Sequence, residues 1–99
     1  YSDDYTKHIG YSITKSGVIG LTKYLATYLA PKIRVNAIVP GGIENGQSEQ
    51  FVKNYSDNTP MKRMMKKEEI IGISKYLASD DSSYTTGSLF NVDGGWSSW

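Results

Sequence analysis

The segment from Ile33 to Val39 constrains the fold most. It is short, rich in β-branched residues and bounded by Pro31 and Pro40, and its second half is apolar on both faces. Proline lacks the amide hydrogen that regular backbone pairing uses, so the two prolines delimit the segment. Strands that are apolar on both faces are typical of parallel sheets with both faces covered. The sequence therefore predicts one strand of a covered parallel sheet in an α/β protein.

Helical patterns lie on both sides of this strand. From Ile9 to Leu29 apolar residues recur at steps of three and four, and Ala30-Pro31 ends the pattern. From Lys67 to Ala78 the same spacing returns, with acidic residues in the first turn, where the helix dipole favours them. Leu89 to Val92 is then predicted as a second short strand. The order strand, helix, strand predicts a right-handed crossover that places two parallel strands side by side.

The segment from Glu44 to Met65, called the flap below, is polar and weakly patterned. Ser48 to Tyr55 has some helical character, and Thr59-Pro60 would end it. We expect the flap to be mobile. Because two strands do not form a stable sheet, we also expect further strands alongside, either from upstream residues or from another subunit.

Composition argues against several classes of function. The net charge is +1, and the basic run from Lys62 to Lys67 is followed by acidic residues, which favours a solvated loop over a nucleic-acid surface. With no cysteine and with His8 as the one histidine, we expect neither thiolate chemistry nor a metal site. No apolar stretch approaches the roughly 20 residues that span a bilayer, and no signal pattern opens the chain. We expect a cytoplasmic protein that binds no membrane.

Tyr11 and Lys15 lie four residues apart in the first helical pattern, so their side chains are expected on one face, about one turn apart. Spacing alone is uninformative, because chance accounts for such a pair in a chain with 8 tyrosines. A second pair does occur at Tyr28 and Lys32, but Pro31 interrupts its helix.

The context of the first pair is more specific. Its motif and the segments that follow it, in order, are Tyr11-Ser12-Ile13-Thr14-Lys15, Arg34-Val35-Asn36, Pro40-Gly41 and Val92-Asp93-Gly94-Gly95. In that order and at those separations, they resemble the short-chain dehydrogenase/reductase family over nearly the whole chain. The resemblance implies an α/β, Rossmann-type doubly wound parallel sheet, here its carboxy-terminal part with two strands and two to three helices. Residues 1–99 would then be one portion of a single domain whose amino-terminal dinucleotide-binding half is absent.

The resemblance also implies an oxidoreductase that uses NAD or NADP to interconvert a carbonyl and an alcohol. Tyr11 would exchange a proton with the substrate oxygen while hydride moves to or from the nicotinamide. A free tyrosine has a pKa of about 10, too high for a base near neutrality. An ammonium group on Lys15, about 6 Å away at an effective dielectric constant of about 20, would favour the phenolate by about 3 kcal/mol, or about two pKa units. Lys15 would also bind the nicotinamide ribose.

The turn after the first strand is implied to bind the same cofactor. Pro40, Gly41 and Gly42 would let the backbone approach the nicotinamide, and Ile43 would offer its amide to the carboxamide. Asn45 stands where the family often has a threonine whose hydroxyl meets the cofactor, so an amide would have to replace that hydroxyl here. By contrast, Asp93-Gly94-Gly95 is expected to be a tight turn with an architectural role.

Two parts of the family's machinery would lie upstream of Tyr1: the serine that polarises the substrate oxygen and the glycine-rich loop. Without that loop the pyrophosphate has no anion site, so we expect the chain alone to be inactive. Tyr1 stands where an initiator Met would be expected, which points to lost residues. The alternative hypothesis is a truncated, non-catalytic oligomerisation or interaction module derived from such an enzyme.

Partners are implied by the resemblance alone. The substrate would be a small carbonyl or alcohol, with a sugar-related compound suggested by likeness to bacterial enzymes near surface-sugar and flagellin-glycan pathways. The assembly would be a homodimer or homotetramer, in which the helix at Tyr11–Leu29 packs against its symmetry mate and the last helix and strand form a second contact. Aromatic residues expected in the core or in such an interface are Tyr24, Tyr28, Tyr76, Phe90, Trp96 and Trp99.

Overall fold

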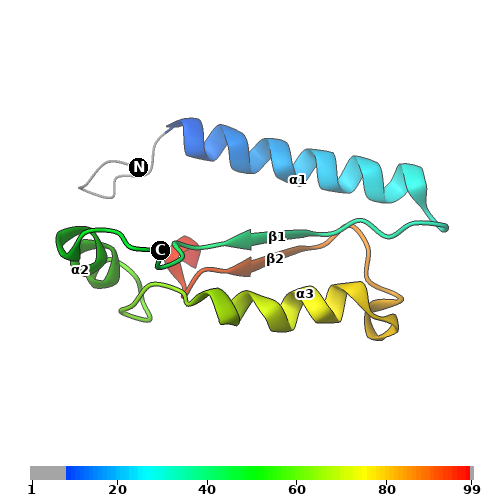
Figure 1. Ribbon diagram of the computed structural model, residues 1–99. Coiled ribbons are helices and arrows are strands. Elements are labelled where there is room, and N and C mark those ends of the chain that lie inside the picture. The colour runs from blue at the N-terminus through cyan, green and yellow to red at the C-terminus, as the bar shows by residue number, and fades with distance from the viewer. Residues whose placement is uncertain (1–8, 99) are drawn as a thin grey trace.

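The computed structural model describes residues 9–98, and their side chains from residue 14 onward (Figure 1). The helices and strands, in chain order, are α1 (Ile9–Leu29), β1 (Ala37–Pro40), α2 (Glu49–Asp57), α3 (Ile71–Ala78) and β2 (Leu89–Val92). Short 3₁₀ turns occur at Lys67–Ile70, Asp80–Ser82 and Trp96–Ser98.

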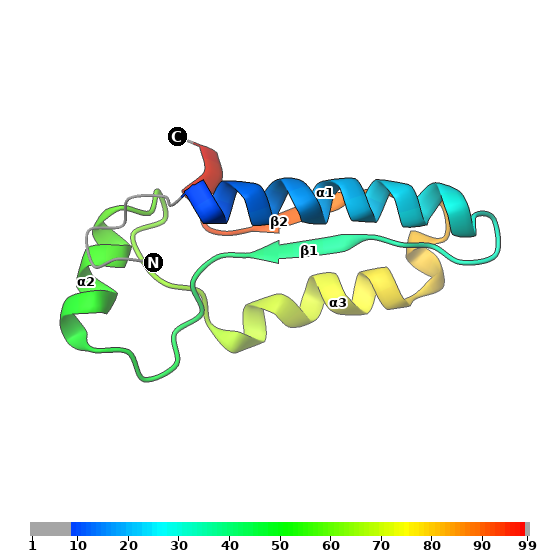
Figure 2. The same ribbon diagram turned by 90° about the horizontal axis from the view of Figure 1, so that it is seen from above.

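The two strands pair in parallel, from Ala37 opposite Leu89 to Pro40 opposite Val92. This confirms the predicted order of strand, helix and parallel strand. Figure 1 shows the strand pair between α1 and α3, while α2 lies beyond the end at which both strands stop. Figure 2, the view from above, shows that α1 begins at this same end of the sheet. The start of α1, the ends of both strands and α2 therefore share one end of the molecule.

Helix α1 ends where its apolar period predicts, because Pro31 cannot continue it. The first strand is shorter than the predicted Ile33–Val39. Before Ala37, one backbone bond, from Gly87 N to Val35 O at 2.7 Å, is supplemented by the side chains of Arg34 and Asn36, which bond to the segment that precedes β2. The amide of Asn36 donates to Thr85 O at 2.9 Å and accepts from Ser88 N at 3.0 Å. A regular ladder starts only where both segments are extended.

Arg34 ties the end of α3 to this strand. Its guanidinium donates to Ser82 Oγ at 2.8 Å and to the carbonyl oxygen of Leu77 at 3.2 Å, with longer bonds to the carbonyls of Ser79 and Thr85. The last carbonyls of a helix have no intrahelical partner, and a cation at this end also interacts favourably with the negative end of the helix dipole. One side chain thus caps α3 and fixes it to the sheet.

The flap is the part of the chain that departs most from expectation. The helical character expected at Ser48–Tyr55 is confirmed by α2, but the end of the flap, which was expected to be mobile, supplies two buried side chains, Met64 and Met65. Ser48 caps the helix, its hydroxyl accepting from Phe51 N at 3.2 Å. The core cluster of the described residues lies here, formed by Tyr55, Met64 and Trp96. The flap is therefore anchored to the carboxy-terminal turn by apolar contact.

Large apolar surfaces of α1 and β1 remain uncovered. Leu21, Tyr24 and Tyr28 on α1 are 59%, 62% and 71% exposed, and Ile33 before β1 is 54% exposed. A hollow of about 780 Å³ also lies between β1 and α3, lined in part by apolar side chains. The radius of gyration is 15.4 Å, against about 13 Å for a compact domain of this length. These surfaces fit the expectation of further strands or subunits alongside.

The aromatic residues divide between core and surface. Trp96 belongs to the core cluster, whereas Tyr24, Tyr28 and Tyr76 are exposed, and Trp99 lies outside the described residues.

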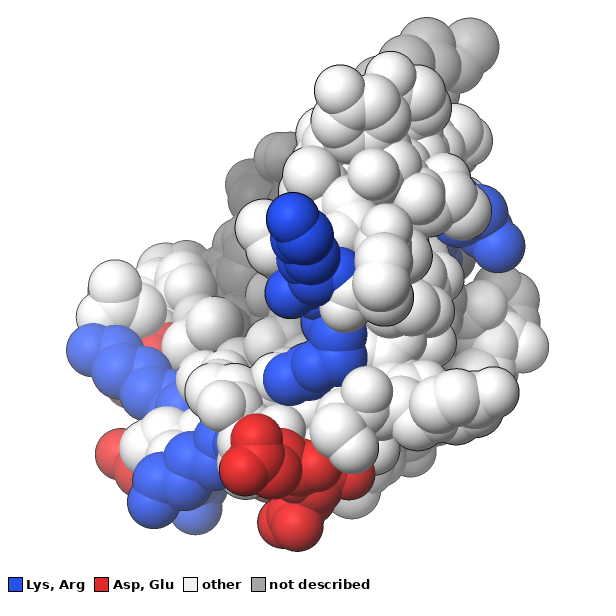
Figure 3. Space-filling view, turned by 90° about the vertical axis from the view of Figure 1, so that its right-hand side faces the viewer, with Lys and Arg blue, Asp and Glu red and all other residues white. Residues whose placement is uncertain are grey.

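Basic and acidic side chains share the end of the molecule opposite α2 (Figure 3). Among residues 9–98, no helix is long and apolar enough to cross a membrane. The described side chains also include no group of three or more metal-ligating residues.

Candidate functional site

Helix α1 carries both members of the predicted proton-transfer pair. Tyr11 and Lys15 lie one turn apart on its backbone, a rise of about 6 Å. Lys15 is half-buried, while the side chain of Tyr11 lies outside the described residues. The contact between the two side chains therefore stays a prediction. Both positions belong to the first two turns of α1, and α1 begins near the end of the sheet where β1 and β2 stop (Figures 1 and 2).

The glycine turn, Pro40–Ile43, continues β1 at this end. Gly41 N donates to Val92 O at 2.9 Å, so the turn stays joined to β2 after the strands end. A methyl group on Gly41 would lie 2.9 Å from the Cα of Asp93, and one on Gly42 would lie 2.7 Å from Cζ of Tyr55. Both distances are shorter than real contacts allow. Glycine is required here because the molecule's own backbone and ring fill the space, a reason that the sequence did not reveal.

Gly42 is held on both of its peptide planes. Its N–H donates to the hydroxyl of Tyr55 at 2.5 Å, and its carbonyl accepts from Met65 N at 2.9 Å. Glu44 N donates to Met65 O at 2.9 Å, so Ile43 and Met65 form a parallel bridge. The last residue of the flap is thus hydrogen-bonded to the glycine turn and to the first residue of the flap.

The bridge fixes the direction of the amide that is expected to contact the cofactor. The peptide between Gly42 and Ile43 is trans and planar, so its C=O and N–H point in opposite directions. Because the carbonyl faces Met65, the N–H of Ile43 points away from Met65. The direction of the Ile43 N–H is thus set by the hydrogen bonds of Gly42 O and Glu44 N, in which the Ile43 N–H takes no part.

Asn45 lies in a local turn of the flap. Its N–H donates to Oε1 of Gln47 at 2.7 Å, and Nε2 of Gln47 donates back to Ile43 O at 2.9 Å. The side chain of Asn45 is exposed. The turn holds the backbone that leaves Ile43, while the cofactor contact proposed for Asn45 stays a prediction.

The ring of Tyr55 is fixed in place by other aromatic and polar contacts. It stacks on Trp96 with centroids 4.8 Å apart and planes at 7°, and both residues are at most 5% exposed. Parallel rings at this separation gain about 0.5–1.5 kcal/mol beyond their burial. Buried Thr59 donates its hydroxyl to Tyr55 O at 2.7 Å, which holds the backbone as well. Sequence analysis missed this role for Tyr55, although the residue closes the predicted helical stretch.

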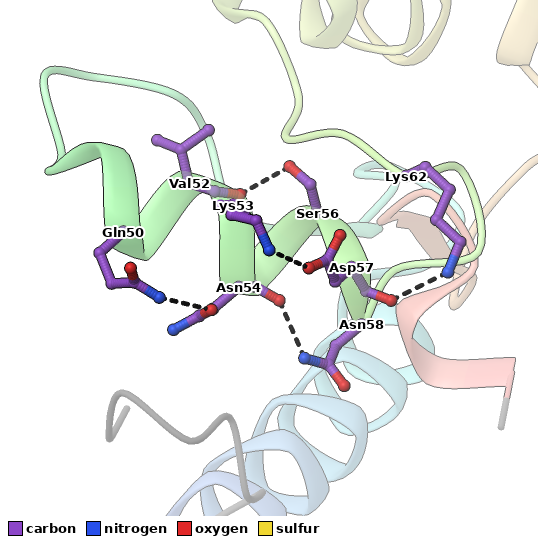
Figure 4. Close-up of polar contacts among 8 residues, drawn as sticks. All are labelled: Gln50, Val52, Lys53, Asn54, Ser56, Asp57, Asn58 and Lys62. Carbon is purple, nitrogen blue, oxygen red and sulfur yellow. Dashed lines mark hydrogen bonds and ion pairs between the residues drawn. The ribbon is translucent and has the colours of Figure 1, made fainter.

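The outer face of α2 is held by its own polar side chains (Figure 4). Gln50 donates to Asn54 at 2.8 Å, and Lys53 pairs with Asp57 at 3.1 Å. Lys62 reaches back to the carbonyl of Asp57 at 2.9 Å, which closes the loop after the helix. Exposed pairs of this kind contribute little each, about 0.3–0.5 kcal/mol. They favour the helix without tying it to the rest of the molecule.

The turn at Asp93–Gly95 packs beside the glycine turn, as expected of an architectural element. The Asp93 carboxylate accepts from Gly95 N at 3.0 Å and from Ser97 N at 3.3 Å. Gly94 and Gly95 have φ of 63° and 91°, a region that other residues rarely adopt. Met61 N donates to Gly94 O at 3.1 Å, so the flap contacts this turn too.

A small pocket of about 120 Å³ lies between the two turns and the flap. Sites for drug-sized ligands have volumes of about 300 Å³ or more, so we assign the pocket no ligand. Arg63 and Glu69 stand at its margin in a two-pronged ion pair, with N–O distances of 2.6 and 2.8 Å. The hydrogen bonds from Arg63 and from Lys66 N lower the pKa of Glu69 to about 2, and the same pair raises the pKa of Arg63. The basic side chains of this run are exposed, as expected of a solvated loop, whereas the ion pair with Glu69 was not predicted from the sequence.

Comparison with known proteins covers nearly the whole chain. A family model described as enoyl-(acyl carrier protein) reductase matches residues 3–97. The chain is 44% identical over 99 residues to 2-keto-3-deoxy-L-fuconate dehydrogenase of Xanthomonas campestris, covering 88% of this chain and 33% of the relative. It is 40% identical over 92 residues to 3-oxoacyl-[acyl-carrier-protein] reductase of Aquifex aeolicus, covering 88% and 37%.

A solved structure is similar over the same region. The short-chain dehydrogenase of Leptospira borgpetersenii, with bound NAD⁺, superposes with a TM-score of 0.83 at 43% identity, covering 97% of this chain and 38% of that protein. The chain thus spans little more than a third of the length of the relatives it matches.

Proposed function

The chain belongs to the short-chain dehydrogenase/reductase family, and we propose that the protein it forms part of transfers hydride between NAD or NADP and a small carbonyl or alcohol. One observation carries the proposal. Helix α1 begins at the end of the sheet where the glycine turn lies, so the positions of Tyr11 and Lys15 share that end with the backbone of Gly42 and Ile43.

The backbone geometry fits the nicotinamide end of such a cofactor. The N–H of Ile43 is turned away from Met65 by the bridge and would donate to a carboxamide oxygen. Gly41 and Gly42 leave room for Asp93 and for the ring of Tyr55, which hold the turn that carries this N–H. When bound, NAD or NADP supplies or accepts the hydride.

The chain's own residues would handle the proton. Tyr11 would give its hydroxyl proton to the substrate oxygen during reduction, or take a proton from the alcohol during oxidation. The Lys15 ammonium, one helical turn away, would stabilise the phenolate and bind the ribose hydroxyls. Asn45 would offer its amide where the family often has a threonine.

The substrate class follows from the relatives by analogy. Relatives at 44% and 40% identity are a 2-keto-3-deoxy-L-fuconate dehydrogenase and a 3-oxoacyl-[acyl-carrier-protein] reductase, so we propose a sugar-related carbonyl or alcohol first and an acyl-derived carbonyl second. A solved relative holds NAD⁺, so NAD is the first cofactor to test. We further propose a homodimer or homotetramer in the cytoplasm, in which the uncovered face of α1 is buried.

The test is hydride transfer by the complete polypeptide that contains this chain. NADH oxidation and NAD⁺ reduction would be followed by the absorbance of the reduced nicotinamide, with sugar-derived ketones and alcohols as substrates. Tyr11→Phe is expected to lower kcat by roughly 10²–10⁴, the contribution of a positioned acid or base. Tyr84→Phe is the matched control, because Tyr84 is fully exposed. Equal rates for Tyr11→Phe and the parent would contradict the proposed mechanism.

The second candidate is a non-catalytic oligomerisation module, favoured by the exposed apolar residues Leu21, Tyr24 and Tyr28 on α1. The chain expressed alone is expected to show no turnover under either hypothesis. The complete polypeptide separates them, because a module would associate without oxidising NADH or NADPH.

A further inference from the structure

We infer that Tyr55 is a positioning residue for the glycine turn, and that it couples the seating of the flap to the grip on the nicotinamide. This inference rests on the proposed function and deepens it. Tyr55 would touch neither cofactor nor substrate. It would act through the peptide of Gly42 and, one residue further, through the N–H of Ile43.

Without a restraint, the backbone of Gly42 would be free to adopt many conformations. Glycine populates more backbone conformations than any other residue, so an unrestrained glycine next to a ligand-binding amide weakens the grip on the ligand. In this turn a larger residue is excluded, because a methyl group on Gly42 would lie 2.7 Å from the ring of Tyr55. The turn must therefore be ordered by hydrogen bonds rather than by a side chain of its own.

The hydrogen bonds that order the glycine turn come from two residues of the flap. Met65 restrains the carbonyl side of Gly42, and Tyr55 restrains the N–H side. Met65 reaches the turn as part of a backbone bridge, whereas Tyr55 reaches it from α2. If α2 moved away from Trp96, the N–H side of Gly42 would lose its partner while the bridge could persist. A displacement of α2 would thus affect the glycine turn through Tyr55.

The ring of Tyr55 is itself held rigidly. The stack on Trp96 and the Thr59 hydroxyl on the Tyr55 carbonyl leave the phenol ring little freedom. A rigid donor or acceptor transmits position better than a flexible one, because less order has to be gained on binding. By reciprocity, cofactor bound at the turn would stabilise α2 as much as a seated α2 strengthens cofactor binding.

The experiment removes the hydroxyl and keeps the ring. In the complete polypeptide, Tyr55→Phe is expected to raise the Kd for NADH roughly three- to tenfold, in the range of coupling between linked sites. The Kd is read from NADH fluorescence, and the KM for NADH is expected to rise more than kcat falls. Tyr84→Phe removes an exposed hydroxyl and is expected to leave the Kd unchanged.

A merely structural role would give a different result. A protein that unfolds more readily has less active enzyme, so kcat falls while the Kd of the folded molecules stays the same. An unchanged Kd in Tyr55→Phe would overturn the inference, even if its thermal midpoint falls. If Tyr55→Phe does not fold, amide exchange at Gly42 in the parent protein decides. Slower exchange with NADH supports the coupling, and an unchanged rate overturns it.

The inference and the proposed function fail in separable ways. A parent protein that neither binds nor oxidises NADH or NADPH would overturn both. Inactive Tyr11→Phe together with an unaltered Kd in Tyr55→Phe would keep the proposed function and overturn the role of Tyr55 alone.

Discussion

Replacing Gly42 with alanine tests the packing of the glycine turn. The added methyl carbon would lie 2.7 Å from Cζ, 2.8 Å from Cε2 and 3.0 Å from the hydroxyl oxygen of Tyr55. These ring atoms cannot easily retreat, because the ring is stacked on Trp96. Overpacking of this kind costs about 1–3 kcal/mol, and loss of the bond from Gly42 N to Tyr55 would add about 1 kcal/mol. We expect Gly42→Ala to destabilise the chain by about 2–4 kcal/mol.

The control is the same substitution at Gly72 in α3, where a methyl group would meet nothing within 4 Å. Alanine is favoured over glycine in a helix by about 0.5–1 kcal/mol, so Gly72→Ala is expected to stabilise the chain. In the complete polypeptide, taken to have the length of the relatives, 1 kcal/mol shifts the melting temperature by roughly 2–4 °C. Circular dichroism melts should therefore move in opposite directions, with Gly42→Ala lower by on the order of 10 °C. A melting temperature for Gly42→Ala at or above that of the parent would refute the packing described for Tyr55.

Two further predictions concern the polar contacts that hold the flap and α3. Arg34→Leu removes the cap on α3 and is expected to cost about 2–4 kcal/mol in urea unfolding. Arg34→Lys should recover less than half of it, because one ammonium cannot replace the guanidinium fork; full recovery would show that charge alone matters. The pKa of Glu69 is lowered to about 2, so its contribution to stability is present above its ordinary pKa of about 4.5 and is lost as the pH falls toward 2. Glu69→Gln should thus lose less stability than the parent between pH 6 and pH 2.5, as measured by urea midpoints, and equal losses would contradict the pairing with Arg63.

Local patterns predicted the elements well where a local cause set their limits. Helix α1 ends where Pro31 demands, and Leu89–Val92 forms the second strand as predicted. The first strand was predicted to begin at Ile33 because the apolar pattern begins there. Pairing instead depends on a partner, and the partner strand begins at Leu89.

The site could be predicted only in part, for a similar reason. The positions of Tyr11 and Lys15 follow from the period of one helix, and their side-chain contact stays a prediction. The restraint on Gly42 involves residues 42, 55, 65 and 96, which come from three segments: the glycine turn, the flap and the carboxy-terminal turn. No period or local motif relates such residues. The sequence showed the glycine at position 42, but it did not show that the ring of Tyr55 fills the space beside it.

One volume at the end of the sheet is shared by positions 42 and 55. As long as a full tyrosine ring occupies it, position 42 can hold no side chain, and a relative with a larger residue at 42 must carry a smaller one at 55 or move its flap helix. Substitutions at these two sites should therefore be exchanged together when segments are transplanted between members of the family. A chimera that takes the turn from one enzyme and the flap from another would inherit either a collision or a void.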